Sequence, residues 1–414
     1  MQTDSYNSKR KGGLWQLALA SFVLAALTGF LYRLGMIGWL PDWGLSVGNI
    51  RHAHSHLMFF GWAVPLPFLI MRNSILQWRE SSQRGARWMK SAVGGTLLFG
   101  LASFPFFLIY GYRPVAFVST SLPLSVILSG FVMICWYVFT WGYWQARPAL
   151  RNKTSQSWFD GALTMLLISS LGAWGVAVVQ AVDPANHLLM KGLTHFFLAT
   201  FTEGWVVLVL LSLFVLKLPV EPDNWPVSQN FSLGCIAIGA PLTFPYGISE
   251  TLLSPSLLLT ARLGGAVAAI GLLQAFYAIG SSGRWNNSIW IWPLALVGLK
   301  ALMQLTASVI PSSFLFSDHG LRIFYLHVLL LGAFTLAIMA WWHESANIPD
   351  WFFNGIVLSI VIVLGSLLLP TSLWPAMWTG PWIFYLVAAA ALLPALALGA
   401  YWFMMIQSQN NIQQ

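Results

Sequence analysis

Apolar stretches long enough to cross a lipid bilayer fill most of this sequence and constrain its fold more than any other feature. A membrane-spanning helix needs about 20 mostly apolar residues, and its backbone groups must be hydrogen-bonded within the span. With 57% apolar and 8% charged residues and a mean hydropathy of +0.71, the chain differs from any soluble domain. We predict a single all-α polytopic membrane bundle over residues 1–414. Its roughly twelve transmembrane helices are expected near residues 14–34, 51–71, 92–111, 117–144, 159–181, 188–216, 231–247, 259–280, 288–310, 321–342, 351–370 and 381–404.

The net charge of +8 comes from basic residues in short segments between the apolar stretches. Such residues set membrane topology and contact anionic headgroups, so we expect membrane lipids as partners and no nucleic acid. With a cytoplasmic N-terminus, thirteen basic residues lie at inner ends and six at outer ends, which favours cytoplasmic N- and C-termini. The inner group is Lys9, Arg10, Lys11, Arg72, Arg79, Arg84, Arg87, Lys90, Arg147, Arg151, Lys153, Lys217 and Arg284. The outer group is Arg33, Arg51, Arg113, Lys191, Arg262 and Arg322.

The histidines give the strongest indication of function. On the predicted map, seven of the eight fall at the outer ends of three spans, and only His343 is at an inner end. Polar groups are costly in a membrane, and imidazole is a common ligand of metals and haem iron. Two histidines from different helices at one depth suit axial ligation of a low-spin haem, whereas a tetrahedral zinc site lacks a thiolate or a clear third ligand. The seven are His52, His54 and His56 on the second span, His187 and His195 on the sixth, and His319 and His327 on the tenth.

Two arrangements remain open for the first histidine cluster. On a helix, His52 and His56 share a face, while His54 points about 160° away. In the first, His54 binds a metal or haem inside the bundle, and His52 and His56 form hydrogen bonds at the interface. In the second, His52 and His56 bind it, and His54 forms the hydrogen bonds. His327 lies one to two turns into its span, and Gly332 would let a flat macrocycle or another helix approach. A simple hydrogen-bonded core histidine is the alternative.

Two charged residues lie near the middle of predicted spans, and two arginines flank the histidines. Glu203 is a candidate proton relay or ligand, or else a protonated side chain bonded to backbone. Lys300 is a candidate proton relay as well, and is either neutral or paired with a carboxylate. Arg51 and Arg322 stand beside the histidines of the second and tenth spans, where they suit haem propionates. Arginines that extend toward the headgroups are an equally good interpretation.

The histidine-bearing segments resemble subunit I of the haem-copper oxidase and nitric oxide reductase superfamily. LTGFLYRLGMIGWLP followed by NIRHAHSHLMFFGW is similar to its first two helices and implies that His54 ligates the low-spin haem. VDPANHLLMKGLTHFFLATFTEGW resembles helix six, whose histidine binds the second metal; here it is His195, with Glu203 as in nitric oxide reductases. FYLHVLLLGAF resembles helix ten and implies His327 as the second low-spin haem ligand.

The sequence also departs from that superfamily. Tyr325 replaces the histidine that ligates the high-spin haem, PLTFPYG lacks the helix-seven histidine pair, and Ala199 replaces an iron-binding glutamate. The resemblance therefore implies a retained low-spin haem and a lost dinuclear centre. RHAHSHLMFFGW and LHVLLLGAFTLAIM are also similar to stretches of the NnrS-type membrane haem proteins of nitric oxide metabolism.

These resemblances imply a multi-pass protein of the bacterial inner membrane with a bis-histidine, low-spin haem b (heme b). Its role would be electron transfer, or nitric oxide binding and tolerance, with a periplasmic or quinol electron donor and a partner subunit. His195, together with His187, His52 or His56, is the candidate site for copper or for a second haem. Three alternatives stay open: an active nitric oxide or oxygen reductase, a cofactor-free proton- or metal-coupled transporter, and a scaffold of a partner complex.

Overall fold

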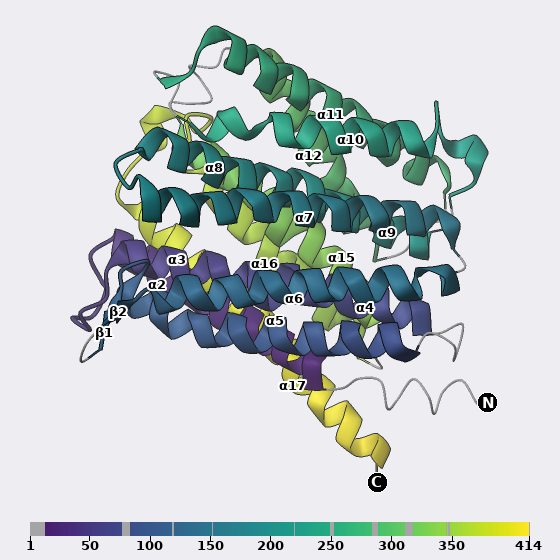
Figure 1. Ribbon diagram of the computed structural model, residues 1–414, viewed down its shortest axis with the longest axis horizontal. Coiled ribbons are helices and arrows are strands. Elements are labelled where there is room, and N and C mark those ends of the chain that lie inside the picture. Colours follow the sequence, from purple (N-terminus) through teal and green to yellow (C-terminus); the bar gives the residue numbers. More distant parts are fainter. Residues whose placement is uncertain are drawn as a thin grey trace. The chain divides into compact units, whose positions relative to one another are not determined.

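The computed structural model describes residues 13–76, 83–117, 120–150, 152–218, 220–248, 252–283, 289–310, 318–344, 346 and 348–413, and these are almost entirely helical (Figure 1). A short antiparallel hairpin, β1 (Val115–Ala116) with β2 (Ser121–Leu122), accounts for the strands among them. The predicted all-α class is confirmed, and the number of long apolar helices identifies a multi-pass membrane protein. Of the basic residues used for topology, Lys9, Arg10, Lys11, Arg79, Arg151 and Arg284 lie outside the described ranges.

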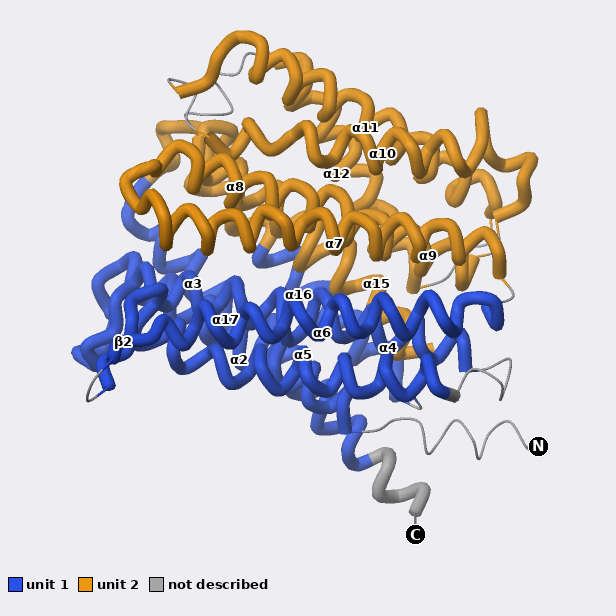
Figure 2. Tube along the Cα trace, viewed as in Figure 1, with its two compact units in different colours: residues 1–151, 346–363, 380–414 blue, residues 152–345, 364–379 orange. Residues whose placement is uncertain are grey.

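The chain forms two compact units, which Figure 2 shows in different colours. The first comprises residues 1–151, 346–363 and 380–414, and the second comprises residues 152–345 and 364–379. The first unit contains α2 (Gly13–Met36), α3 (Val47–Met58), η1 (Phe59–Ala63), α4 (Pro65–Leu76), α5 (Gln83–Tyr110), α6 (Leu124–Ala146), η3 (Arg147–Ala149), most of α16 (Asp350–Leu368) and α17 (Trp382–Gln413).

The second unit holds the middle of the chain. Its elements are α7 (Lys153–Val182), α8 (His187–Ala199), η4 (Thr200–Val206), α9 (Val207–Lys217), η5 (Pro222–Asn224), α10 (Gln229–Leu242), η6 (Phe244–Gly247), α11 (Pro255–Ser281), α12 (Ile291–Val309), α14 (His319–His327), η8 (Val328–Phe334), α15 (Thr335–His343) and η9 (Ala376–Trp378).

Eleven of the twelve predicted spans correspond to described helices long and apolar enough to cross a membrane. The predicted span at 231–247 is different: α10 has 14 residues and is followed by the 3₁₀ turn η6. Pro245 in η6 explains the early end, because it lacks the N–H that would continue the helical ladder, whereas Pro241 lies within the last turn of α10. The span predicted to begin at residue 117 instead begins at Leu124, after the hairpin, with Pro123 at its N-cap.

Three membrane helices each contain a π-helical segment, and they are the three that carry the outer histidines. The continuous helices are 47–76, 187–217 and 319–343, and their π segments are η1, η4 and η8. They are also the most buried spans. In their most apolar 18-residue segment, 67–94% of the residues are buried, compared with 39–50% in the other eight spans. Since π segments are rare and concentrate at functional positions, these helices are the first place to look for a site.

Each π segment contains one glycine that contacts the preceding span in the sequence. A Cβ at Gly61 would lie 2.5 Å from Cβ of Ser21 on α2. A Cβ at Gly204 would lie 2.9 Å from Cγ of Met165 on α7. A Cβ at Gly332 would lie 2.9 Å from Cδ1 of Leu296 on α12. Small residues permit such close helix approach in membranes. The same close approach thus occurs on all three helices that contain a π segment, each time against the membrane span that precedes it in the described chain.

Candidate functional site

His54 faces α2, where one of its ring nitrogens is fixed. Its Nδ1 lies 2.7 Å from the carbonyl oxygen of Ala25, and because a carbonyl only accepts, Nδ1 carries the proton. Gly29, one turn further along α2, leaves room for the ring, since a Cβ there would lie 3.0 Å from Cε1 and Nδ1. A neutral imidazole in this tautomer directs its lone pair from Nε2. None of the described residues hydrogen-bonds to that atom, so His54 has the form of a pre-oriented ligand.

His52 and His56 lie on the other face of α3, as the helical period predicts. The ring of His56 stacks on Phe107 with centroids 3.9 Å apart, and its Nε2 lies 2.8 Å from the Tyr112 hydroxyl. His52 packs edge-on against the same tyrosine at 4.7 Å. Burial raises the pKa of Tyr112 to about 12, against the opposing effect of Arg51, so its hydroxyl stays protonated. The structure therefore separates His54 from the flanking pair, and the pair forms an aromatic contact with α5 and the turn after it.

His195 lies beside the break between α10 and α11. A Cβ on Gly247 in η6 would lie 1.9 Å from His195 Nδ1, so the bare backbone of this turn packs directly against the imidazole. Phe196 makes an edge-on contact with Phe244 of the same turn at 6.2 Å. His187 is exposed at the first position of α8, two turns away. The two candidate ligands of a second metal are therefore in different surroundings, one covered by η6 and one at the surface.

His327 is the last residue of α14 and directly precedes the π segment η8. Its Nδ1 lies 2.7 Å from the carbonyl oxygen of Ile323 in its own helix, so Nδ1 carries the proton here too. His54 belongs to the first unit and His327 to the second, so their pairing stays a prediction from the sequence.

The two arginines beside these histidines have different surroundings. Arg51 is exposed at the start of α3. Arg322 is half-buried on α14, close enough to His195 to act on it electrostatically. Its Nε is buried and has no hydrogen-bond partner among the described residues. Arg322 therefore retains an unused donor, as a residue that binds an anionic group would, whereas Arg51 is open to solvent or headgroups.

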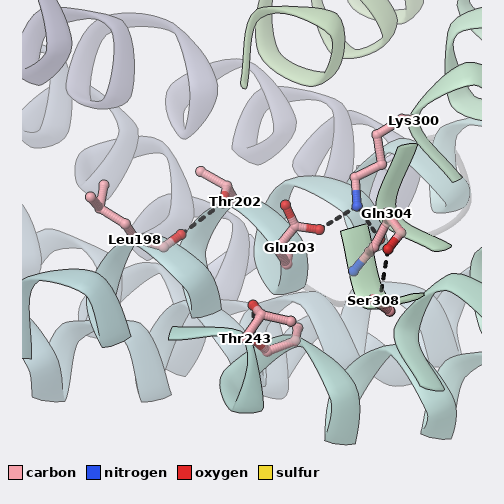
Figure 3. Close-up of polar contacts among 8 residues, drawn as sticks. Leu198, Thr202, Glu203, Thr243, Lys300, Gln304 and Ser308 are labelled. Atoms are coloured by element: carbon pink, nitrogen blue, oxygen red, sulfur yellow. Dashed lines mark hydrogen bonds and ion pairs between the residues drawn. The ribbon is translucent and has the colours of Figure 1, made fainter. Parts of the chain in front are cut away.

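A buried ion pair lies within the second unit. Lys300 on α12 donates through Nζ to Glu203 of η4 and to Oε1 of Gln304, one turn along its own helix (Figure 3). Lys300 is 1% exposed, Gln304 4% and Glu203 6%, so all three side chains are buried. The Lys300 ammonium also lies 5.2 Å from the ring centroid of Tyr325. The interpretation of Lys300 as paired with a carboxylate is confirmed, and its partner is Glu203.

Tyr325, which stands where the resemblance expects a haem ligand, takes part in this cluster. It lies close enough to the Glu203 carboxylate and to Tyr246 of η6 to interact with both electrostatically. Sequence reasoning identified Glu203, Lys300 and Tyr325 but did not identify Gln304, Ser308 or Tyr246. The sequence did contain a signal for two of them. Polar residues occur at positions 300, 304 and 308, and an interval of four places all three on one face of α12.

Neither the geometry nor comparison with known proteins assigns a family. Among the described residues, no group of three or more His, Cys, Asp or Glu side chains lies close enough together to hold a metal ion. No known family model matches the sequence, and no curated protein matches it significantly. The histidine-bearing π helices and the buried Glu203–Lys300 pair are therefore the two features from which a function has to be inferred.

Proposed function

We propose that this chain is a membrane haem protein in which His54 is an axial ligand of a low-spin haem b. The observation that carries the proposal is the Nδ1–Ala25 hydrogen bond of 2.7 Å, which sets the tautomer and directs the Nε2 lone pair. A histidine that ligates a metal nearly always donates its other N–H to a carbonyl, a carboxylate or water in this way. The small residue Gly29 beside the ring fits the same role, because it leaves the imidazole space to keep this orientation.

The second axial ligand is assigned to His327 on sequence grounds, and Arg322 and Arg51 are assigned to the haem propionates. The tautomer of His327 and the buried, unpartnered Nε of Arg322 are compatible with these roles. A haem with two histidine ligands supplies one-electron transfer, and with an open position it also binds small gases. We assign the protein to electron transfer, or to nitric oxide binding and tolerance, in a bacterial inner membrane with cytoplasmic termini and a periplasmic or quinol electron donor.

Optical spectra of the purified chain, oxidised and reduced, together with haem extraction and metal analysis, test this proposal. We expect a single low-spin b-type signal that disappears in His54→Gly and returns when imidazole is added to that variant. His327→Ala is expected to convert the spectrum to a five-coordinate type. His52→Ala and His56→Ala are the matched controls, because their rings face α5, and they should retain the wild-type spectrum.

Carbon monoxide distinguishes the catalytic alternative. A reductase needs an open coordination position, so a spectrum that changes with carbon monoxide would favour the nitric oxide or oxygen reductase, with His195 as ligand of the second metal. An unchanged spectrum supports a pure electron carrier. A well-folded chain from haem-replete cells that contains no haem would contradict the proposal.

A proton- or metal-coupled transporter is the second candidate function, and the Glu203–Lys300 pair favours it. An ionised pair inside a membrane protein is expensive and commonly marks an ion or proton pathway. Transport would require the pair to open and close during a cycle, so Glu203→Gln and Lys300→Met should both abolish flux in proteoliposomes. The haem proposal predicts instead that the b-type signal survives both substitutions.

A further inference from the structure

The buried face of α12 carries two polar side chains, Gln304 and Ser308, in addition to the ion-paired Lys300. Lys300, Gln304 and Ser308 follow each other at intervals of four residues and are 1%, 4% and 7% exposed. Lys300 and Gln304 interact directly, and Ser308 Oγ donates to the Gln304 carbonyl oxygen at 2.9 Å (Figure 3). Each buried polar group in a membrane span costs free energy. Three such side chains in a row on one helix face therefore indicate a functional role and not packing alone.

One donor on this face has no partner. Nε2 of Gln304 is buried and lacks a hydrogen-bond acceptor among the described residues, although Oε1 of the same amide accepts from Lys300. An unsatisfied buried donor costs about 1–3 kcal/mol, so native proteins seldom leave one without a partner. A water molecule satisfies such a donor where several polar groups converge, and the side chains of Lys300, Gln304 and Ser308 supply those groups.

The line of polar groups continues to the end of α12. The Tyr246 hydroxyl lies 3.3 Å from the Ala307 carbonyl oxygen and also interacts with the Ser308 side chain. Gly265 on α11 keeps this junction open, because a Cβ there would lie 2.5 Å from Ser308 Oγ and 3.5 Å from Tyr246 Cε2. Val309, the next residue, is the last residue of α12, and the end of a membrane-spanning helix lies near the membrane surface. Polar groups therefore connect Glu203 with the C-terminal end of α12. The last of them, Tyr246, belongs to the turn η6 that follows α10.

We infer that this face holds a hydrated path through which the Glu203–Lys300 pair exchanges protons with the aqueous phase at the C-terminal end of α12. The water next to Gln304 Nε2 is its central member, Ser308 and Tyr246 line its outer part, and Tyr325 closes it beside Glu203. A proton enters along the water and reaches the Glu203 carboxylate, which lies against the Lys300 ammonium. The path requires no haem and lies wholly within the second unit.

Hydroxyl-radical footprinting of the purified full chain tests the path, because radicals formed from bound water oxidise adjacent side chains even in a membrane interior. Tyr246 and Tyr325, which are half-buried, should be oxidised in the wild type, whereas the fully buried Tyr143 and Tyr401 should not, and the dependence on Gln304 decides whether path water is responsible. Gln304→Leu should reduce oxidation of both path tyrosines severalfold by removing the water's partner. Gln274→Leu is the matched control: this glutamine is 7% exposed, but its amide already donates to the Ser228 carbonyl oxygen at 2.7 Å.

Repeating the oxidation shortly after mixing into water labelled with oxygen-18 tests the connection to the aqueous phase. Heavy oxygen on Tyr325 means that the path water exchanges with bulk water, as we expect, and light oxygen alone would overturn the proposed access. Equal oxidation of Tyr325 in wild type and Gln304→Leu would overturn the hydrated site itself. Unchanged elution and melting temperature of each variant show that it is folded.

Discussion

The backbone of Gly247 lies directly against the imidazole of His195, with space for no side chain between them. A Cβ at position 247 would lie 1.9 Å from Nδ1, a distance that no real contact allows. The turn η6 is thus closed over the histidine, and this contact joins the broken span to α8. Any metal or haem bound by His195 would have to use the part of the ring that η6 leaves uncovered.

Gly247→Ala should therefore destabilise the second unit by about 1–3 kcal/mol, because either η6 or the His195 ring has to move. Gly234→Ala on α10 is the matched control, since a Cβ there meets nothing within 4 Å. Alanine at that helical position should be neutral or stabilise by up to about 1 kcal/mol. Thermal unfolding in detergent measures both variants, and equal melting temperatures for the two would contradict the close contact.

Removing one member of the Glu203–Lys300 pair should cost far more than removing both. Lys300→Met leaves a buried carboxylate without its cation, and Glu203→Gln leaves a buried ammonium without its anion, at about 3–5 kcal/mol each. The double variant should recover most of that loss, because no uncompensated charge remains. A double-mutant cycle on unfolding free energies gives the coupling, and additive losses would mean that the two residues do not interact in the folded protein.

Asp318 should make stability depend on pH in the acid range. Burial raises the pKa of this carboxyl, but hydrogen bonds outweigh that effect and hold the pKa below its ordinary value of 3.8. The donors are the backbone and side chain of Ser372 and the backbone N–H groups of Leu321 and Gly320. The carboxylate caps α14 and binds the Ser372 N–H at 2.6 Å. Because the folded pKa is depressed, this stabilisation is complete above pH 3.8 and declines as the pH falls toward the folded value.

Asp318→Asn isolates that charge, because asparagine remains a good N-cap. The melting temperature of the wild type should exceed that of Asp318→Asn near neutral pH, and the difference should shrink as the pH falls below 4. A difference that stays constant down to the acid limit would mean that the cap, and not the charge, provides the stabilisation.

Most of the fold was predictable from the sequence, because about 20 apolar residues in a row permit little else than a membrane helix. The short α10 was mispredicted because apolar residues continue through Pro245, and composition alone does not show that the helix ends before that proline. The predicted span began at residue 117 because the apolar residues start there, although β2 of the hairpin precedes the helix, which begins at Leu124. The π segments left no periodic signal, since each adds a residue within an otherwise uniform apolar helix.

The site was predictable only where it depends on one helix. The opposite orientations of His54 and of the His52–His56 pair follow from the helical period alone. Contacts between distant segments were not accessible: Lys300 and Glu203 are 97 positions apart, and nothing local to either residue selects the other. The position of η6 over His195 likewise depends on how α8, α10 and α11 pack, which a single sequence does not reveal.

The surroundings of His54 offer the sharpest test of its role. In Gly29→Ala, the new methyl would lie 3.0 Å from two ring atoms, so the imidazole has to shift by a few tenths of an ångström and the Nδ1–Ala25 hydrogen bond weakens. If His54 is an axial ligand, loss of this orienting bond should lower haem affinity about tenfold and shift the reduced spectrum. Haem titration of the apo-protein measures the affinity.

Gly94→Ala is the appropriate control for Gly29→Ala, because it lies in a helix of the same unit and a Cβ there meets nothing within 4 Å. That variant should retain the wild-type affinity and spectrum. If Gly29→Ala binds haem as tightly as Gly94→Ala and has an unshifted spectrum, the Nδ1–Ala25 bond does not orient a ligand. His54 would then be a hydrogen-bonded core residue whose role is to hold α2 against α3.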